Sequence, residues 1–350
     1  MQPNPFMQRL DLRLPVIQGP FGGGLSSVEL VAAVGVRGGL GSFGAHQVAA
    51  DGIGPLAAQI RAATAAPFAL NLWIPGPPSE ALLPDAEAFA RGWQFFEPYF
   101  RELGLERPEP PRQLLPDYPA QIEALLDARP AVFSFVFGVP DAKILAACRS
   151  RNMLTLGAAT TVAEARALEA AGVDAIVASG MEAGGHRPAF LDPAEAGLNG
   201  SLALVPQIVD CVSIPVVAAG GIADARGVRA ALALGAQAAQ IGTAFLACAE
   251  SGAHPLHREL LFTERAFATT LTRAFTGRLA RGLCNRWTDE MAARTSELLP
   301  YPLQGWWLGE MRAAALAQGR TELVSLWSGQ TAPNLRHRTV AALLEALATG

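Results

Sequence analysis

Lysine is almost absent from this 350-residue chain, whose sequence contains only Lys143. Enzymes that form a Schiff base with a carbonyl substrate need a lysine in the active site. Lys143 falls within a predicted helix, residues 141–150, and not at the end of a predicted strand. A phosphate-binding aldolase or isomerase that depends on lysine is therefore a poor interpretation of this sequence.

Charge of either sign is also scarce, since charged residues make up 17% of the chain and the formal net charge is -4. Proteins that bind nucleic acid carry a basic surface, so we expect no nucleic-acid partner. No uninterrupted apolar stretch has the length of a membrane helix. Residues 1–12 lack the basic and apolar regions of a signal peptide. We therefore expect a cytoplasmic protein with no membrane partner.

Cysteine and histidine are few and do not form a metal-binding pattern. No C-x-x-C motif occurs, and the spacing of the cysteines gives no disulfide framework, so we interpret them as reduced core residues. They are Cys148, Cys211, Cys248 and Cys284. His254 and His257 have helical spacing but no carboxylate companion, so we expect no metal site.

The chain is instead rich in apolar residues, at 51%, and in turn formers, with 35 glycines and 26 prolines. Short apolar runs alternate with predicted helices, which indicates strands buried on both faces of a parallel sheet. The eight predicted strands are residues 14–18, 40–43, 68–74, 131–137, 153–156, 173–178, 215–219 and 238–241. This alternation favours an α/β fold of the (β/α)₈ TIM-barrel type. Residues 19–24 lack the G-x-G-x-x-G spacing that a dinucleotide-binding open sheet would need.

Two segments interrupt the alternation. Residues 75–130 are framed by prolines and contain an aromatic-rich helical stretch, and insertions of this length are usually lids or binding loops. After Thr243 the pattern becomes mainly helical. We expect residues 1–255 to form the barrel, with 75–130 partly an inserted lid, and 256–322 to form a smaller helical domain. Residues 323–350 would return to the barrel and add its closing helix.

Polar residues and glycines gather where the predicted strands end, which is where barrels of this type place their active sites. Glycine turns after the seventh and eighth strands, at Gly220-Gly221 and Gly242-Thr243, predict a phosphate site. Asn71 interrupts an apolar strand, so it either bonds neighbouring backbone or contacts a ligand. His186 follows Gly184-Gly185 beyond the sixth strand, a position suited to proton transfer near neutral pH.

Several segments carry a resemblance to a known family. They are P-V-I-Q-G-P-F-G-G-G-L-S (15–26), A-S-G-M-E-A-G-G-H-R (178–187), P-V-V-A-A-G-G-I-A-D (215–224), A-Q-I-G-T-A-F (239–245), T-R-A-F-T-G-R-L-A-R-G (272–282), Y-P-L-Q (301–304) and S-G-Q (328–330). Over nearly its whole length the chain resembles the nitronate monooxygenases, formerly 2-nitropropane dioxygenases, which are FMN-dependent barrels.

The resemblance implies a function and a set of site residues. It implies FMN-dependent oxidation of alkyl nitronates, and of nitroalkanes, by O₂ to a carbonyl compound and nitrite, a detoxification carried out by a monomer or homodimer. His186 would be catalytic: protonated, it would stabilise an anionic nitronate, and neutral, it would remove the α-proton of a nitroalkane. FMN would be held by Gln18, Gly22, Gly23, Gly24, Asn71, Ser179, Gly180, Gly184, Gly185, Gly220, Gly221, Gln240, Ile241, Gly242, Thr243 and Gln330.

Two positions depart from the family pattern. Relatives often have glutamine where this chain has Ser179, which puts one flavin contact in question. Many have a second histidine where this chain has Val136, a position that would face the substrate. A separate alternative stays open because related enzymes share the glycine turns and the G-G-H segment: an FMN-dependent NAD(P)H:quinone or enoyl reductase of the same barrel superfamily.

Overall fold

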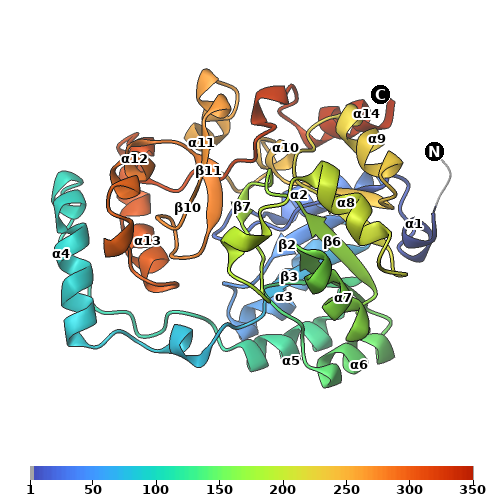
Figure 1. Cartoon of the computed structure of the whole chain (residues 1–350), viewed down its shortest axis with the longest axis horizontal. Coiled ribbons are helices and arrows are strands. Elements are labelled where there is room, and N and C mark those ends of the chain that lie inside the picture. Colours follow the sequence, from blue (N-terminus) through green and yellow to red (C-terminus); the bar gives the residue numbers. More distant parts are fainter. Residues whose placement is uncertain (1–3, 350) are drawn as a thin grey trace.

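Eight parallel strands form a ring at the centre of the computed structural model, which describes residues 4–349. Their order is β1-β9-β8-β6-β5-β4-β3-β2, and a parallel bridge between Ile17 and Leu40 joins the two ends. The strands are β1 (Val16–Gln18), β2 (Gly41–Gly44), β3 (Phe68–Trp73), β4 (Val132–Val136), β5 (Leu154–Ala159), β6 (Ala175–Ser179), β8 (Val216–Ala219) and β9 (Ala238–Ile241). The predicted TIM barrel is confirmed (Figure 1).

Helices surround the ring and bury the outward faces of the strands. They are α2 (Val28–Val36), α3 (Ala50–Ala63), α5 (Tyr118–Ala128), α6 (Ala142–Ser150), α7 (Val162–Ala170), α8 (Ser201–Val209), α9 (Ala225–Ala233) and α14 (Val340–Thr349). Several begin with a side chain that caps the free backbone N–H groups: Ser27 accepts from the N–H of Leu30 at 2.9 Å. In β6 all five residues are buried, as expected for a strand covered on both faces.

A short helix that the sequence pattern did not reveal, α1 (Pro5–Arg9), lies against the interior of the barrel. Asn4 caps it by accepting from the N–H of Met7 at 2.9 Å. Phe6 and Met7 are buried with residues of the strands, including Val177. The opposite end of the barrel is therefore the one left open for a ligand.

The inserted segment between β3 and β4 is held against the C-terminal part of the chain. It contains η1 (Pro78–Ala81) and α4 (Ala86–Glu102), and α4 contacts α13 (Leu303–Ala317). At this contact the rings of Phe96 and Trp307 are stacked with centroids 5.6 Å apart. The insertion is therefore packed through an aromatic cluster at α4, beside α12 and α13 in Figure 1.

The region expected to be helical is mostly so, and it also contains a β-hairpin. Its helices, with those that flank it, are α10 (Thr243–Leu246), α11 (Pro255–Leu260), η3 (Glu264–Phe267), α12 (Arg286–Ala292), η4 (Thr295–Glu297), α13, η5 (Thr321–Leu323) and η6 (Ala332–Asn334); η2 (Ala194–Gly197) precedes α8. Strands β10 (Thr269–Thr272) and β11 (Ala280–Leu283) form the hairpin, and β11 also pairs with β7 (Gly185–His186). The hairpin thus holds the segment that carries His186.

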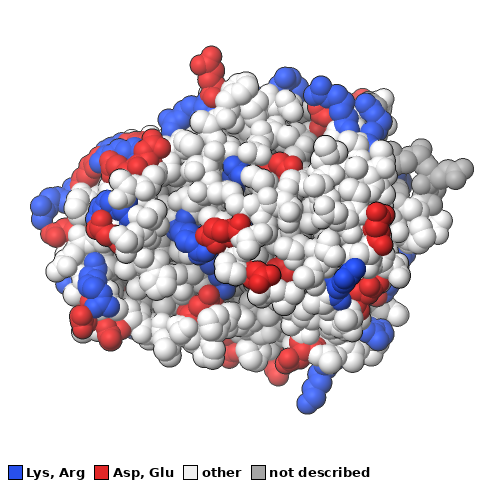
Figure 2. Space-filling view, in the orientation of Figure 1, with Lys and Arg blue, Asp and Glu red and all other residues white. Residues whose placement is uncertain are grey.

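The surface shows no concentration of one charge on the face in Figure 2, where acidic and basic side chains are interspersed and large areas carry neither. Within residues 4–349, no helix combines the length and the apolar character needed to cross a bilayer.

Candidate active site

A cavity of about 630 Å³ opens at the carboxyl ends of the barrel strands. The barrel loops form one side of it, and α13 with residues 324–331 forms the other. Of the residues predicted to form the site, those that line the cavity are Gly22, Gly23, Asn71, Ser179, Gly184, Gly185, His186, Gly220, Gly221, Gln240, Gly242 and Thr243. The structure therefore brings most of the predicted site together.

The other predicted residues lie outside the lining, and these are Gln18, Gly24, Gly180, Ile241 and Gln330. Gln18 is fully buried and its Oε1 accepts from the N–H of Ser42 at 2.9 Å, so it links β1 to β2. Ile241 belongs to the hydrophobic core. Gln330 is exposed, and its neighbour Gly329 lines the cavity instead.

The glycines form a cradle because three loops approach each other closely there. A Cβ atom on Gly184 would lie 2.6 Å from the backbone nitrogen of Gly329. Gly220 has a φ of +98°, and a Cβ there would lie 3.0 Å from the carbonyl oxygen of Gly180. The hydroxyl of Thr243 accepts from the N–H of Gly329 at 2.9 Å. Only residues without a side chain fit these positions, which leaves backbone N–H groups free to face a phosphate.

A buried arginine holds the loop after β6 that contributes to this cradle. Arg187 is 2% exposed and donates to the carbonyl oxygens of Gly180 and Ser179 at 2.6 and 2.8 Å. Burial lowers its pKa to about 10, which still leaves it charged at neutral pH. Because Arg187 directly follows His186, these bonds also fix the chain that carries the histidine.

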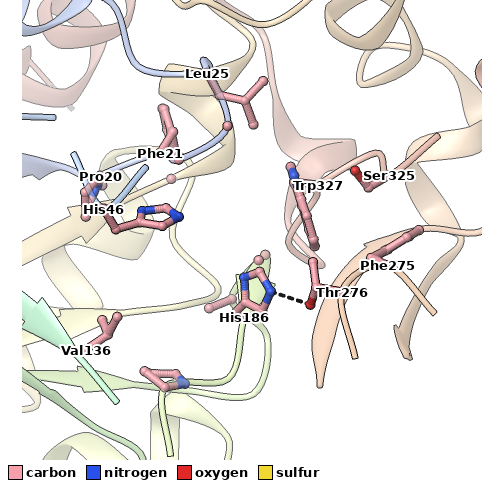
Figure 3. Close-up of a pocket in the computed structure, with 18 of the residues that line it drawn as sticks. Pro20, Phe21, Leu25, His46, Val136, His186, Phe275, Thr276, Ser325 and Trp327 are labelled. Atoms are coloured by element: carbon pink, nitrogen blue, oxygen red, sulfur yellow. Dashed lines mark hydrogen bonds between the residues drawn. The ribbon is translucent and has the colours of Figure 1, made fainter. Parts of the chain in front are cut away.

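His186 lies in the cavity wall and is oriented by a single hydroxyl group. Its Nε2 atom is 2.8 Å from Oγ1 of Thr276, in the loop between β10 and β11 (Figure 3). Burial, the nearby His46 and the charge of Arg278 lower the pKa of His186 to about 3. The imidazole is therefore neutral at neutral pH. A histidine must be in this form to accept a proton as a base.

Aromatic rings enclose the histidine. Trp73 meets His186 edge to face with centroids 4.9 Å apart, and Trp327 lies 5.2 Å from it. Trp73 also stacks on His46 at a centroid distance of 3.8 Å, with the two rings within 8° of parallel. These contacts fix the ring of His186 and create an apolar compartment beside it.

An ion pair joins the inserted segment to the hairpin next to this compartment. Arg278 donates to Glu80 at 2.6 Å, and both side chains are largely buried. The guanidinium lies 4.1 Å from the ring centres of Phe137 and Tyr301. Cation–π contact with two rings holds the arginine in place, so the pair connects η1 to the active-site hairpin.

Two amides supply polar groups to the cavity. The side chain of Asn71 donates to Oγ of Ser134 at 3.0 Å, so part of its hydrogen-bonding capacity is met within the barrel. Gln240 lines the cavity, and its side chain has no hydrogen-bond partner among residues 4–349. A ligand with donors and acceptors along one edge would satisfy these groups.

Sequence reasoning missed several residues of the compartment, namely His46, Trp73, Thr276, Tyr301 and Trp327. Three had a detectable signal. Thr276 lies inside the quoted segment 272–282, and His46 follows the second predicted strand, where barrel loops carry functional residues. Tyr301 likewise lies inside the segment 301–304, whereas Trp73 and Trp327 had no signal, because tryptophan near a strand end is more often part of the core.

Fold and cavity together define the class: a (β/α)₈-barrel enzyme that binds a small ligand at the carboxyl ends of its strands. The family model for nitronate monooxygenase matches residues 4–350. The chain therefore belongs to the nitronate monooxygenase family and is an oxidoreductase.

Individual relatives agree with this assignment. A probable nitronate monooxygenase of Staphylococcus aureus (strain Newman) is 38% identical over 329 residues, which cover 94% of this chain and 91% of the relative. The structure of nitroalkane oxidase from Streptomyces ansochromogenes is 39% identical and has a TM-score of 0.88, covering 98% of this chain and 96% of that one. FabK from Thermotoga maritima is more distant: it is 26% identical and has a TM-score of 0.75, and the match covers 99% of this chain and 96% of FabK.

Proposed function

We propose that this chain binds FMN in the cavity and oxidises alkyl nitronates, and nitroalkanes, with O₂ to a carbonyl compound and nitrite. The observation that carries the proposal is the position of His186, oriented by Thr276, in the same cavity as the glycine cradle. Family membership supports the same reaction.

The cavity suits FMN in its shape and its chemistry. The cradle at Gly184, Gly220 and Gly221 offers backbone N–H groups to a phosphate in a space that side chains would fill. Asn71 and Gln240 offer amides to the polar edge of a flavin ring. When bound, FMN supplies the two-electron redox chemistry, and the protein binds and orients the reactants.

Burial favours the neutral form of His186, which is the form in which a histidine can accept a proton. A protonated histidine would attract a nitronate, but burial disfavours that charge. Neutral His186 can take the α-proton of a nitroalkane through Nδ1, the ring nitrogen that is not beside Thr276. The surrounding Trp73 and Trp327 exclude water from the proton being transferred.

Anaerobic reduction of the flavin tests the proposal and separates it from the reductase alternative. Purified protein should be yellow, and ethyl nitronate should bleach its flavin absorbance in the absence of O₂, whereas NADH and NADPH should not. Bleaching by NADH or NADPH alone would instead identify a reductase. A colourless protein that does not bind added FMN would exclude both functions.

A further inference from the structure

A second histidine faces the same cavity as His186 but comes from the other side of the barrel. His46 lies two residues beyond β2, and its ring projects into the cavity (Figure 3). Gln121 of α5 donates to the carbonyl oxygens of His46 and Val48 at 3.2 and 2.7 Å. The backbone that presents His46 is therefore held by a buried side chain of a barrel helix.

Packing fixes the ring of His46 in one orientation. One face is stacked on Trp73 at 3.8 Å. The edge of the ring fills the place where a side chain on Gly22 would lie, since a Cβ there would be 2.0 Å from Cε1 of His46. A ring held on its face and at its edge can direct a hydrogen bond without losing further conformational entropy.

The environment also determines which ring nitrogen carries the proton. Nδ1 of His46 is enclosed and has no hydrogen-bond partner within residues 4–349. An enclosed N–H without an acceptor is rarer and costlier than an enclosed lone pair. The proton therefore belongs on Nε2, which is not enclosed and belongs to a side chain that lines the cavity. Burial and the charge of Arg278 lower the pKa of the ring to about 3, so this neutral form persists at neutral pH.

We propose that His46 is a catalytic hydrogen-bond donor, whose Nε2–H binds an oxygen of the substrate's nitro group while His186 removes the α-proton. The inference rests on the proposed function. In the step, the α-C–H bond breaks and its proton moves to Nδ1 of His186. The electron pair of that bond delocalises onto the nitro oxygens, where His46 donates to the developing negative charge. Neutral imidazoles serve as such donors in other enzymes, because they stabilise charge without giving up a proton.

The position of His46 suits the role of a hydrogen-bond donor because His46 and His186 both contact the indole ring of Trp73. Trp73 is stacked on His46 and lies edge to face with His186, which sets the relative placement of donor and base. Val136 pairs with Trp73 across β3 and β4 and brings only methyl groups to the cavity. His46 is therefore a donor that the barrel side offers beside Trp73.

Two substitutions in the FMN-loaded enzyme test the inference. His46→Phe keeps an aromatic ring on Trp73 and removes the N–H, whereas His46→Gln keeps an N–H donor without the ring. With nitroethane, His46→Phe should lower kcat/KM by about 10²-fold through kcat, since one oxyanion donor typically contributes that much. With preformed ethyl nitronate, His46→Phe should mainly raise KM, because the negative charge on the substrate oxygens is already present before the reaction. His46→Gln should recover most of the nitroethane activity.

Binding of nitrate gives a readout that does not depend on turnover. Nitrate is a planar anion with oxygens placed like those of a nitronate, and calorimetry should show weaker binding to His46→Phe than to wild type or His46→Gln. The inference is overturned if His46→Phe retains wild-type kcat/KM on nitroethane, or if His46→Gln falls as far as His46→Phe. Wild-type enzyme that oxidises neither substrate would overturn the proposed function itself, and the role of His46 with it.

Discussion

Nε2 of His186 and Oγ1 of Thr276 lie 2.8 Å apart and join the strand β7 to the loop of the β10–β11 hairpin. The same hydroxyl accepts from the backbone N–H of Arg278 at 3.3 Å, so its position is fixed by its own hairpin. A base oriented by a second group through one nitrogen can use its other nitrogen toward the substrate. The hairpin is therefore part of the active site and not a remote addition to the barrel.

The first prediction concerns the base itself. His186→Asn should keep the flavin but lower turnover of nitroethane by about 10²–10⁴-fold, the usual contribution of general base catalysis. Oxidation of preformed ethyl nitronate should fall much less, because no α-proton remains to be removed. Steady-state kinetics with both substrates and an absorbance spectrum measure this. Equal losses on the two substrates would contradict a role in proton removal.

The second prediction concerns the orienting hydroxyl. Thr276→Val keeps the shape of the side chain and removes its hydrogen bond to His186, so kcat for nitroethane should fall by roughly 3- to 10-fold, the equivalent of one hydrogen bond. Thr270→Val on β10 is a matched control, since the hydroxyl of Thr270 donates to the carbonyl of Leu271 and not to His186. The control should behave as wild type. If both variants lose the same activity, the hairpin as a whole is being perturbed and Thr276 has no special role.

The third prediction concerns the ion pair between the insertion and the hairpin. Glu80→Gln leaves the largely buried Arg278 without its carboxylate partner. The free energy of unfolding should fall by on the order of 2 kcal/mol, a value between the costs of breaking an exposed ion pair and a fully buried one. Glu87→Gln removes an exposed i,i+4 partner of Arg91 and should cost less than about 0.5 kcal/mol. Urea unfolding of both variants tests the difference. A smaller loss for Glu80→Gln than for Glu87→Gln would refute the role of the pair.

The barrel could be predicted from the sequence because most of its strands are buried, mainly apolar runs, and several of them end in or are followed by glycine or a polar residue. β6, β8 and β9 are such runs, and the positions of the glycine cradle and of His186 follow from their place after these strands. The β10–β11 hairpin could not be predicted in this way. Its strands have four residues each, too short for a period to show, and β7 has two.

The missing part of the site depends on contacts between distant segments. His186 pairs with Ala280 across β7 and β11, and nothing local to either residue indicates this. His46 acquires its role from the face of Trp73 and from the space beside Gly22. Periodicity describes which side of an element is buried, but it does not say which buried side chains meet.

The last prediction concerns stability at mildly acidic pH. Burial lowers the pKa of His46 and His186 to about 3 and that of His257 to about 4, from an ordinary value of 6.5. Below pH 6.5 the unfolded chain therefore binds protons that the folded chain does not, and the free energy of unfolding must fall as the pH falls. Each histidine contributes a slope of up to about 1.4 kcal/mol per pH unit in this window.

Carboxylates whose pKa is lowered, such as Glu102 at about 2, titrate at more acidic pH, so histidines dominate between about pH 5 and 6.5. Urea unfolding across this range should show the decline. His257→Gln replaces a histidine whose Nε2 lies 3.0 Å from the carbonyl of Trp327 and which does not itself line the cavity. Although this variant loses some stability at neutral pH, its slope should be smaller than that of wild type by about one third, as expected for one of three titrating groups. An unchanged slope would mean that His257 binds its proton in the folded chain as readily as in the unfolded chain, and would contradict the prediction.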